Sequence, residues 1–550
     1  MIFLSTLLIS MFITMALIPI LRAAAERAGY GVDFPNPRKV HSAPIPKVGG
    51  LAIALGALVP VLFVADGGRF VNAVLIGAAI VAAFGLADDL RGLGWKAKFA
   101  GQVIAALVVI LHGKLKICFL GECLPAGVSL PDLIAVPLTV IVVVGVTNAI
   151  NLSDGLDGLA GGVCLLIFIC IGFLSFAGDD FPDRLFAMVM CAAVIGAIFG
   201  FLRYNTYPAT VFMGDTGSQL LGFLAICLSL GVTQRSTPLS PFLPLLLVGF
   251  PVLDTLTVMV ERIAAGRSPF TADKNHFHHK LVRLGLFHTE AVVAIYAITA
   301  LLVTAAFLLR YHSDRSLILL YLAFCALVVL ALTAAERSGF RFHRTGFFDV
   351  EIKGRLKQLK DKQLLIRGCF APVEGGVPLL FIAVGLVPGD VPGYFSALAA
   401  GFLVANAFCW AARRELLPAV LRVSFYLTVP LVLRMGQVDA AAWIPPALLW
   451  VYTLGFGVLA LFTVLTLKFT RRQKGFKATP MDFLILVIAL VVPNLPDPMI
   501  RSVHMGELAV KIIVLFFSFE VLLGELRGST TRLTLGVLAG LALLAVRGWV

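Results

Sequence analysis

The amino-acid sequence predicts an all-α protein that crosses a membrane many times. The chain of 550 residues is 59% hydrophobic and 14% charged, with a mean hydropathy of +0.98, whereas a soluble domain has about 25% charged residues. Apolar runs of spanning length recur from one end to the other, and this pattern indicates a polytopic helical bundle. A closed β-barrel would need short segments of alternating hydrophobicity, which the sequence lacks.

The apolar runs predict about 18 transmembrane helices. In the first half we expect them at residues 1–21, 50–66, 71–87, 99–113, 132–150, 159–177, 184–202, 217–233, 241–260, 290–309 and 316–334. In the second half we expect them at residues 375–389, 393–411, 418–434, 445–467, 480–493, 508–523 and 533–548. The run at 375–389 is short and contains two glycines, so it is the weakest of these predictions.

The basic residues predict the orientation of the helices. The net charge is +13, and cytoplasmic loops of membrane proteins carry an excess of Lys and Arg. Placing the N-terminus outside puts most of the 44 Lys and Arg residues on the inner side. The charge therefore indicates membrane topology, and we expect no nucleic-acid partner. No basic segment precedes the first apolar run, which we expect to be a retained helix and not a cleaved signal peptide.

Motifs that can carry chemistry occur only in the first part of the chain. We expect a membrane domain of about 11 helices at residues 1–335 and a further membrane domain of about seven helices, of unknown role, at residues 374–550. A basic cytoplasmic linker at residues 336–373 separates them. Its Lys and Arg residues alternate with apolar ones, which is typical of an amphipathic helix on an anionic leaflet. A solvated linker is the equal alternative.

Two adjacent carboxylates, Asp88 and Asp89, lie where the third predicted span meets the inner side. Such a pair can bind a divalent cation or act as a base, and an Asp at a helix end can also be a cap. Lys98 follows at the start of the next span. Its ammonium can hold a phosphate, or it can simply extend from a helix end to water.

The densest polar stretch at a span end begins at Asn148 and ends at Gly158. It contains the amide of Asn151 and the carboxylates of Asp154 and Asp157. Glycines let a backbone approach a ligand closely, and the two carboxylates share one face if the segment is helical. A role in binding or catalysis is therefore favoured over a purely structural loop.

A third acidic motif places Asp215 between two glycines at the start of the eighth predicted span. A carboxylate is a hard oxygen ligand that suits Mg²⁺. The backbone N–H groups of Gly217 and Ser218 also offer an anion site at a helix N-terminus. An ordinary helix cap is the alternative interpretation.

Three clustered histidines, His276, His278 and His279, form the last motif. A zinc site is disfavoured because no fourth ligand is near in sequence and Arg267 and other cations surround the cluster. Imidazoles among cations are better suited to donate hydrogen bonds to a diphosphate. Asp254, inside the ninth span, is either a functional acid or a packing partner of a nearby arginine.

Three residues outside these motifs are ambiguous. Cys118 and Cys123 share an outward loop, so a disulfide between them is left open. Glu520 lies within an apolar span and is either a functional acid or a satisfied packing acid.

Acids for a hard metal, cations and imidazoles for phosphates, and glycines for close approach together indicate phosphoryl transfer. The motifs, in this order, closely resemble those of the polyprenyl-phosphate N-acetylhexosamine-1-phosphate transferases, membrane enzymes that start bacterial envelope glycans. The resemblance covers about residues 1–335. The sequence His276-Phe277-His278-His279 is similar to the branch that uses UDP-N-acetylglucosamine, because the muramyl-pentapeptide branch has three consecutive histidines.

The resemblance implies that a polyprenyl phosphate attacks a UDP-N-acetylhexosamine and releases UMP. It implies Mg²⁺, with Mn²⁺ as an alternative, bound by Asp215, Asn151 and Asp154. The residues expected to be catalytic are Asp88, Asp89, Asp154, Asp157 and Asp215. Those expected to bind substrate are Lys39, His41, Lys98, Asn148, Asn151, Arg267, His276, His278 and His279.

We expect a multi-pass protein of the bacterial inner membrane, in contact with membrane lipid, with its active site on the cytoplasmic face; whether it forms a homodimer is left open. A transporter is the main alternative, especially for the second half. It predicts binding groups near the bilayer midplane and often an internal repeat, whereas here the carboxylates lie at helix ends and no repeat is visible.

Overall fold

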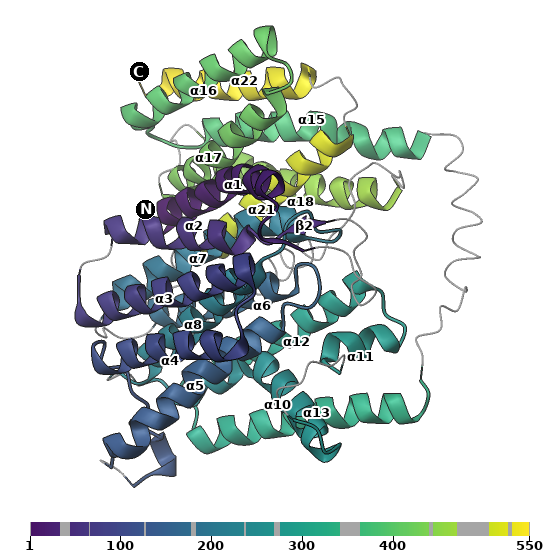
Figure 1. Ribbon diagram of the computed structural model, residues 1–550. Coiled ribbons are helices and arrows are strands. Elements are labelled where there is room, and N and C mark those ends of the chain that lie inside the picture. Colours follow the sequence, from purple (N-terminus) through teal and green to yellow (C-terminus); the bar gives the residue numbers. More distant parts are fainter. Residues whose placement is uncertain are drawn as a thin grey trace. The chain divides into compact units, whose positions relative to one another are not determined.

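The computed structural model shows a chain composed of two compact units, with the boundary between residues 343 and 344 (Figure 1). The structure describes residues 2–33, 44–64, 67–125, 128–177, 183–235, 238–268, 275–340, 364–438, 444–469, 505–525 and 531–548. The span predicted at 480–493, most of the linker at 336–373, and both Lys39 and His41 lie outside the described residues.

Helices account for nearly all regular structure in these residues, and 12 of them are long and apolar enough to cross a membrane. The predicted all-α polytopic fold is confirmed. The physical reason is that backbone N–H and C=O groups in hydrocarbon must be paired within the protein, and a helix pairs them within one segment. The only sheet in the described part of the chain is a pair of two-residue antiparallel strands.

The first unit contains fourteen labelled helical segments and both strands among its described residues. They are α1 (Ile2–Ala28), β1 (Val32–Asp33), β2 (Ile45–Pro46), α2 (Gly49–Val64), α3 (Arg69–Arg91), α4 (Trp95–Leu111), η1 (Gly121–Cys123), α5 (Asp132–Leu152), α6 (Leu159–Ala177), α7 (Arg184–Asn205), α8 (Gly214–Thr233), α9 (Leu243–Leu247), α10 (Gly249–Ala264), α11 (Phe277–Arg283), α12 (His288–Leu308) and α13 (Asp314–Arg337).

Two elements of the first unit differ from the sequence-based prediction. The ninth span is divided into α9 and α10 at Val248. Pro251 has no N–H to donate to the carbonyl of Leu247, four residues earlier, so a continuous helix would lose this bond. The short helix α11, which carries His278 and His279, was not predicted because it is too short for a spanning pattern.

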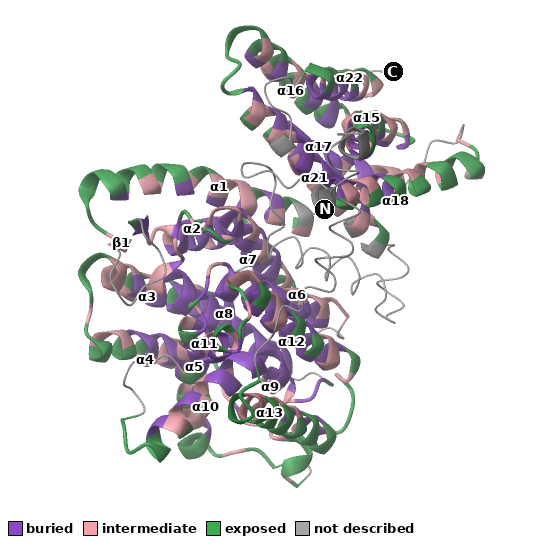
Figure 2. Cartoon of the chain, turned by 90° about the vertical axis from the view of Figure 1, so that its right-hand side faces the viewer, coloured by how far each residue is buried: buried purple, intermediate pink, exposed green. Residues whose placement is uncertain are grey.

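Helix α8 forms the centre of the first unit and is buried along its length (Figure 2). It packs against α2, α3, α5 and α6. At its N-terminal end the backbone of α2 comes into direct contact, because the Gly50 N–H donates to the Met213 carbonyl at 2.8 Å. A Cβ atom on Gly50 would lie 2.2 Å from the Gly217 nitrogen. Glycine at position 50 therefore fixes the start of α8 against the start of α2.

The loop after α4 is held by polar side chains rather than by a disulfide. Cys118 and Cys123 are both free thiols, so the disulfide that the sequence left open is absent. Gln234 Oε1 accepts hydrogen bonds from the backbone N–H groups of Cys118 and Phe119 at 3.1 and 3.0 Å. These bonds satisfy backbone groups of the loop without a covalent link.

The second unit is a separate bundle. Its described helices are α15 (Leu364–Leu386), α16 (Gly393–Ala412), α17 (Leu417–Val438), α18 (Pro446–Phe469), α21 (Met505–Glu525) and α22 (Thr531–Arg547). Helix α22 packs against α15 and α16, and α21 packs against α17 and α18. Glu520 accepts from Arg422 Nε at 2.7 Å and Nη2 at 3.2 Å, and from the Tyr426 hydroxyl. Glu520 therefore links α17 to α21, as expected of a satisfied packing acid.

Candidate active site

Four helix ends meet at one side of the first unit. Asp88 lies in the last turn of α3, Lys98 in the first turn of α4, Asn151 in the last turn of α5 and Asp215 in the first turn of α8. The helices pack in neighbouring pairs, α3 with α4, α4 with α5, α5 with α8 and α8 with α3. Motifs that are up to 127 positions apart in the chain therefore form one polar site.

The centre of this site is a layer of charged side chains. Lys98 Nζ lies 3.1 Å from Asp88 Oδ2 and 2.8 Å from Asp215 Oδ2. Asn151 Nδ2 donates to Asp215 Oδ1 at 2.9 Å and to Ser218 Oγ at 2.8 Å. The side chains of Asp88 and Asp215 are 13% and 24% exposed, so both remain accessible to a ligand. One cation thus bridges carboxylates from two different helices.

A layer of amides lies one turn deeper along the same helices. Gln102 follows Lys98 by four residues, Gln219 follows Asp215 by four, and Asn148 precedes Asn151 by three. Gln102 Nε2 donates to Gln219 Oε1 at 3.0 Å, and Asn148 Nδ2 donates to Gln102 Oε1 at 2.6 Å. Asn148 therefore contacts this buried network rather than the charged layer. These hydrogen-bonded amides lie one helical turn deeper than the charged layer and add no charge to it.

Asp89 binds the start of α8. Its Oδ1 accepts from the Asp215 N–H at 2.9 Å, and its Oδ2 accepts from the Thr216 N–H at 2.9 Å and the Thr216 hydroxyl at 2.6 Å. Helix N-termini attract anions because their first N–H groups are unpaired. A carboxylate of the protein thus occupies the N–H groups of Asp215 and Thr216, whereas the anion site predicted from the sequence was at Gly217 and Ser218. Gly214, with φ of +69°, lies directly beside this carboxylate.

Asp154 and Asp157 occupy the loop between α5 and α6 but have different surroundings. Burial, followed by the charges of Asp215, Asp89 and Asp157, raises the pKa of Asp154 to about 7. Asp157 Oδ2 accepts from the Ala209 N–H at 2.9 Å, and its own N–H donates to His288 Nε2 at 3.0 Å. Asp157 therefore fixes the segment that leads into α8. Asp154 instead interacts through charge with the carboxylates of Asp215, Asp89 and Asp157.

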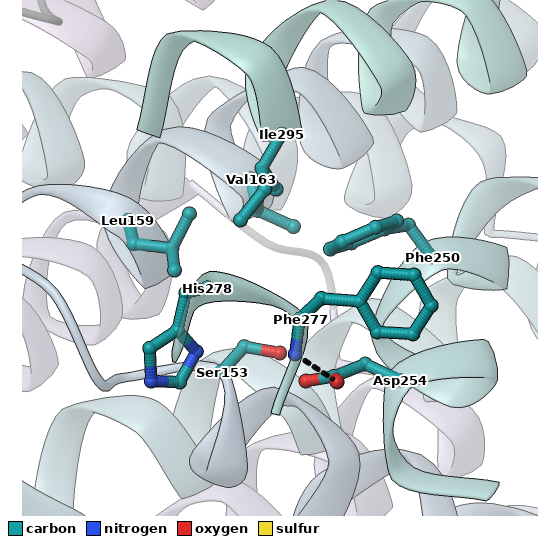
Figure 3. Close-up of a pocket in the computed structure, with 8 residues that line it drawn as sticks. All are labelled: Ser153, Leu159, Val163, Phe250, Asp254, Phe277, His278 and Ile295. Carbon is teal, nitrogen blue, oxygen red and sulfur yellow. Dashed lines mark hydrogen bonds between the residues drawn. The ribbon is translucent and has the colours of Figure 1, made fainter. Parts of the chain in front are cut away.

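The histidine motif is anchored by Asp254 of α10. Asp254 Oδ2 lies 3.0 Å from His276 Nδ1, and Oδ1 accepts from the Phe277 N–H at 2.8 Å (Figure 3). Both Asp254 and His276 are buried. Asp254 therefore sets the start of α11 and the orientation of the His276 ring. Asp254 thus contacts the histidine motif, a partner that neither of the two hypotheses for Asp254 had named.

His278 approaches the loop that carries Asp154. Among the described residues its buried Nε2 has no hydrogen-bond partner, and a Cβ atom on Gly155 would lie 2.3 Å from it. The ring lines a pocket with Ser153 and Asp254 (Figure 3). Burial, followed by the charges of His279 and His276, lowers the pKa of His278 to about 3. His278 is therefore neutral near pH 7 and adds no positive charge to the site.

The remaining predicted residues are less closely placed. Arg267 is exposed just beyond the end of α10. The sequence-based prediction assigned neither Gln219 nor Gln102 to the site. The sequence feature that could have identified Gln219 and Gln102 is their four-residue spacing from Asp215 and Lys98, which places each pair on one helix face.

Fold and site together define a class of protein: a polytopic membrane protein with an acidic, oxygen-rich site at the ends of its helices. Residues 71–233 match the model of the glycosyl transferase family 4. These residues include Asp88, Lys98, Asn151 and Asp215, which form the charged layer.

Named relatives identify the family. The chain is 34% identical over 336 residues to the probable undecaprenyl-phosphate N-acetylglucosaminyl 1-phosphate transferase of Bacillus subtilis, covering 60% of this chain and 90% of the relative. It is 32% identical to the undecaprenyl-phosphate alpha-N-acetylglucosaminyl 1-phosphate transferase of Escherichia coli, covering 56% and 84%. It is 36% identical to a decaprenyl-phosphate N-acetylglucosaminephosphotransferase of Mycobacterium tuberculosis, covering 50% and 74%. The chain belongs to the polyprenyl-phosphate N-acetylhexosamine-1-phosphate transferase family.

Proposed function

We propose that this protein transfers N-acetylglucosamine 1-phosphate from a UDP-sugar to a polyprenyl phosphate. The observation that carries the proposal is the convergence of Asp88, Lys98, Asn151 and Asp215 at one end of the bundle. That position suits a water-soluble nucleotide sugar and a lipid phosphate that meet at the membrane boundary. Relatives whose names state this reaction support it.

The proposed reaction exchanges one phosphoanhydride bond for another. An oxygen of the lipid phosphate attacks the β-phosphorus of the UDP-sugar, the bond between the β-phosphorus and the bridging oxygen breaks, and UMP leaves with that oxygen. A phosphate monoester is largely ionised near neutral pH, because its second pKa is about 6. Asp88 is therefore needed less to remove a proton than to position the attacking phosphate. Positioning and charge neutralisation are the main sources of rate in such reactions.

The residues present fit a divalent metal such as Mg²⁺. Asp215, Asn151 and Asp154 offer hard oxygen atoms, and Lys98 already shows that a cation is bound between Asp88 and Asp215. When bound, the metal would neutralise charge on the diphosphate. In the described residues, no cluster of three His, Cys, Asp or Glu side chains forms a metal site by itself. The substrate's phosphate oxygens would therefore complete the coordination, which is usual for Mg²⁺.

The chain spans the membrane many times, and we assign it to a bacterial inner membrane with the site on the cytoplasmic face. The assignment is supported by the excess of Lys and Arg in the loops at the site's end of the predicted topology. UDP-sugars are cytoplasmic metabolites, so the same face also gives access to the substrate.

The function is tested by incubating purified protein with undecaprenyl phosphate, Mg²⁺ and UDP-GlcNAc and measuring UMP. We expect metal-dependent UMP release that falls by about 10²–10³-fold in Asp215→Asn, the usual effect of removing one preorganised electrostatic group. Ser229→Ala, in the same helix but with its hydroxyl bonded to the Ala225 carbonyl, is the matched control. Folded wild-type protein that releases no UMP from any UDP-N-acetylhexosamine would disprove the proposal.

A further inference from the structure

The ammonium of Lys98 occupies the position between the two carboxylates where a divalent cation would be expected to bind. Its Nζ is within hydrogen-bonding distance of Asp88 Oδ2 and Asp215 Oδ2, at 3.1 and 2.8 Å. These oxygens come from α3 and α8, whereas the lysine comes from α4. A single compact cation thus joins three helices at the centre of the site.

The charge balance explains why a cation is required there. Asp88, Asp89, Asp154 and Asp215 lie close enough for their charges to affect one another. Asp89 is stabilised by the N-terminal N–H groups of α8, but these do not reach the facing oxygens of Asp88 and Asp215. Without Lys98, two partly buried carboxylates would face each other without a counter-ion, which is unfavourable.

We propose that Lys98 and the divalent metal compete for the same carboxylate oxygens, so that metal binding displaces Lys98 from Asp88 and Asp215. The inference rests on the proposed metal-dependent function and extends it. Lys98 Nζ lies between Asp88 Oδ2 and Asp215 Oδ2, and a divalent metal bound to the same two oxygens at about 2.0–2.1 Å would be repelled by the positive charge of this ammonium. Lys98 is 29% exposed and lies in the first turn of α4, so its long side chain has room to turn towards solvent.

After displacement, the Lys98 ammonium is able to bind a phosphate of the substrate. Once the metal balances the carboxylates, Lys98 is a free cation at the mouth of the site, which suits the phosphates of a nucleoside diphosphate. Lys98 therefore stabilises the empty site in one position and binds substrate phosphate in the other. This exchange predicts that removal of Lys98 strengthens metal binding while it weakens catalysis, an outcome that a purely phosphate-binding lysine would not produce.

The test measures Mn²⁺ binding to the full-length protein by the paramagnetic resonance signal of free Mn²⁺, without nucleotide or lipid. We expect Lys98→Met to bind Mn²⁺ roughly tenfold more tightly than wild type, the lower end of what close charge pairs contribute, and to lose UMP formation. Lys96→Met is the matched control, because Lys96 is an exposed lysine of the same helix turn; it should change neither. Adding Asp215→Asn to Lys98→Met should remove the gain.

Unchanged or weaker Mn²⁺ binding in folded Lys98→Met would overturn the inference, as would the absence of Mn²⁺ binding in both proteins. A second measurement uses only wild type and so does not depend on a variant that folds. Acetylation of lysine amines, followed by mass spectrometry, should show Lys98 becoming several-fold more reactive when Mn²⁺ is added, with Lys96 unchanged. Protection of Lys98 by Mn²⁺ would contradict the exchange. Neither Mn²⁺ binding nor lysine acetylation depends on turnover, so both measurements test the exchange of Lys98 and metal even if the transferase proposal is wrong.

Discussion

At the scale of single residues, the five acids named as catalytic perform different tasks. Asp88 and Asp215 form ion pairs with Lys98, Asp89 accepts a hydrogen bond from the N-terminus of α8, and Asp157 accepts one from the Ala209 N–H in the segment before α8. Asp154 alone accepts no side-chain or backbone hydrogen bond within the described part of the chain. The acids therefore divide into Asp88 and Asp215, which pair with Lys98, and Asp89 and Asp157, which fix the backbone around the site.

The raised pKa of Asp154 predicts a pH-dependent stability. The pKa is about 7 in the folded protein and about 3.9 in an unfolded chain. Between these values the folded protein holds a proton that the unfolded chain has released, so the free energy of unfolding falls as pH rises. Asp154→Asn cannot ionise. The stability advantage of Asp154→Asn over wild type should grow from about pH 4 to about pH 7 and then level off.

This prediction is checked by thermal unfolding of detergent-solubilised protein in EDTA across that pH range. Glu26→Gln, which replaces an exposed acid of α1, serves as the control and should show no such trend. An advantage of Asp154→Asn that is equal at every pH would show that Asp154 ionises normally in the folded protein.

At the scale of elements, the site depends on helices that carry a charged residue at the end and an amide one turn deeper. Gln219→Leu would leave Gln102 without the acceptor that lies 3.0 Å away. A buried polar group left without its partner costs about 1–3 kcal/mol. We expect a matching loss of stability and a lower kcat, because Asp215 and Asn151 lie directly above this layer.

The comparison for Gln219→Leu is Ser229→Ala, a buried polar deletion in the same helix that breaks only a bond within α8. Thermal unfolding and UMP release together separate the effects. If Gln219→Leu lowered stability no more than Ser229→Ala and left kcat unchanged, the amide layer would not support the site.

Most spans of the described residues, and the motif that each helix carries, could be predicted from the sequence because apolar length and polar helix ends are local properties. Helix α15 is an exception, since it begins at Leu364 and not at residue 375. The sequence could not determine what each polar group contacts. Asp89 and Asp88 are adjacent, yet one bonds to the backbone of α8 and the other to Lys98. The contact between Asp254 and His276 also depends on packing between separate elements, whereas Pro251 was a local signal for the break at Val248. Lys39 and His41 stay predictions, since they lie outside the described residues.

At the scale of the whole molecule, every described residue of the proposed site lies in the first unit. The family model ends at residue 233, and the three named relatives align with 50–60% of this chain. The role of the second unit is a separate question from the transfer reaction. Its most conspicuous acid, Glu520, is paired with Arg422.

We therefore expect Glu520→Gln to affect stability but not transfer. The variant weakens the charge pair with Arg422, which is 26% exposed, so the loss should be modest, about 1–2 kcal/mol, below that of a fully buried pair. UMP release should match wild type. Loss of UMP release from folded Glu520→Gln would instead show that the second unit takes part in the reaction.

The most direct test of the transfer reaction follows the β-phosphate. Protein, undecaprenyl phosphate and Mg²⁺ are incubated with UDP-GlcNAc labelled with ³²P at the β-phosphorus, and the label is measured in the lipid and aqueous phases. Transfer of the sugar phosphate predicts label in the lipid and unlabelled UMP in water. Labelled UDP in water together with unlabelled glycolipid would mean that only the sugar is transferred, and this would contradict the account.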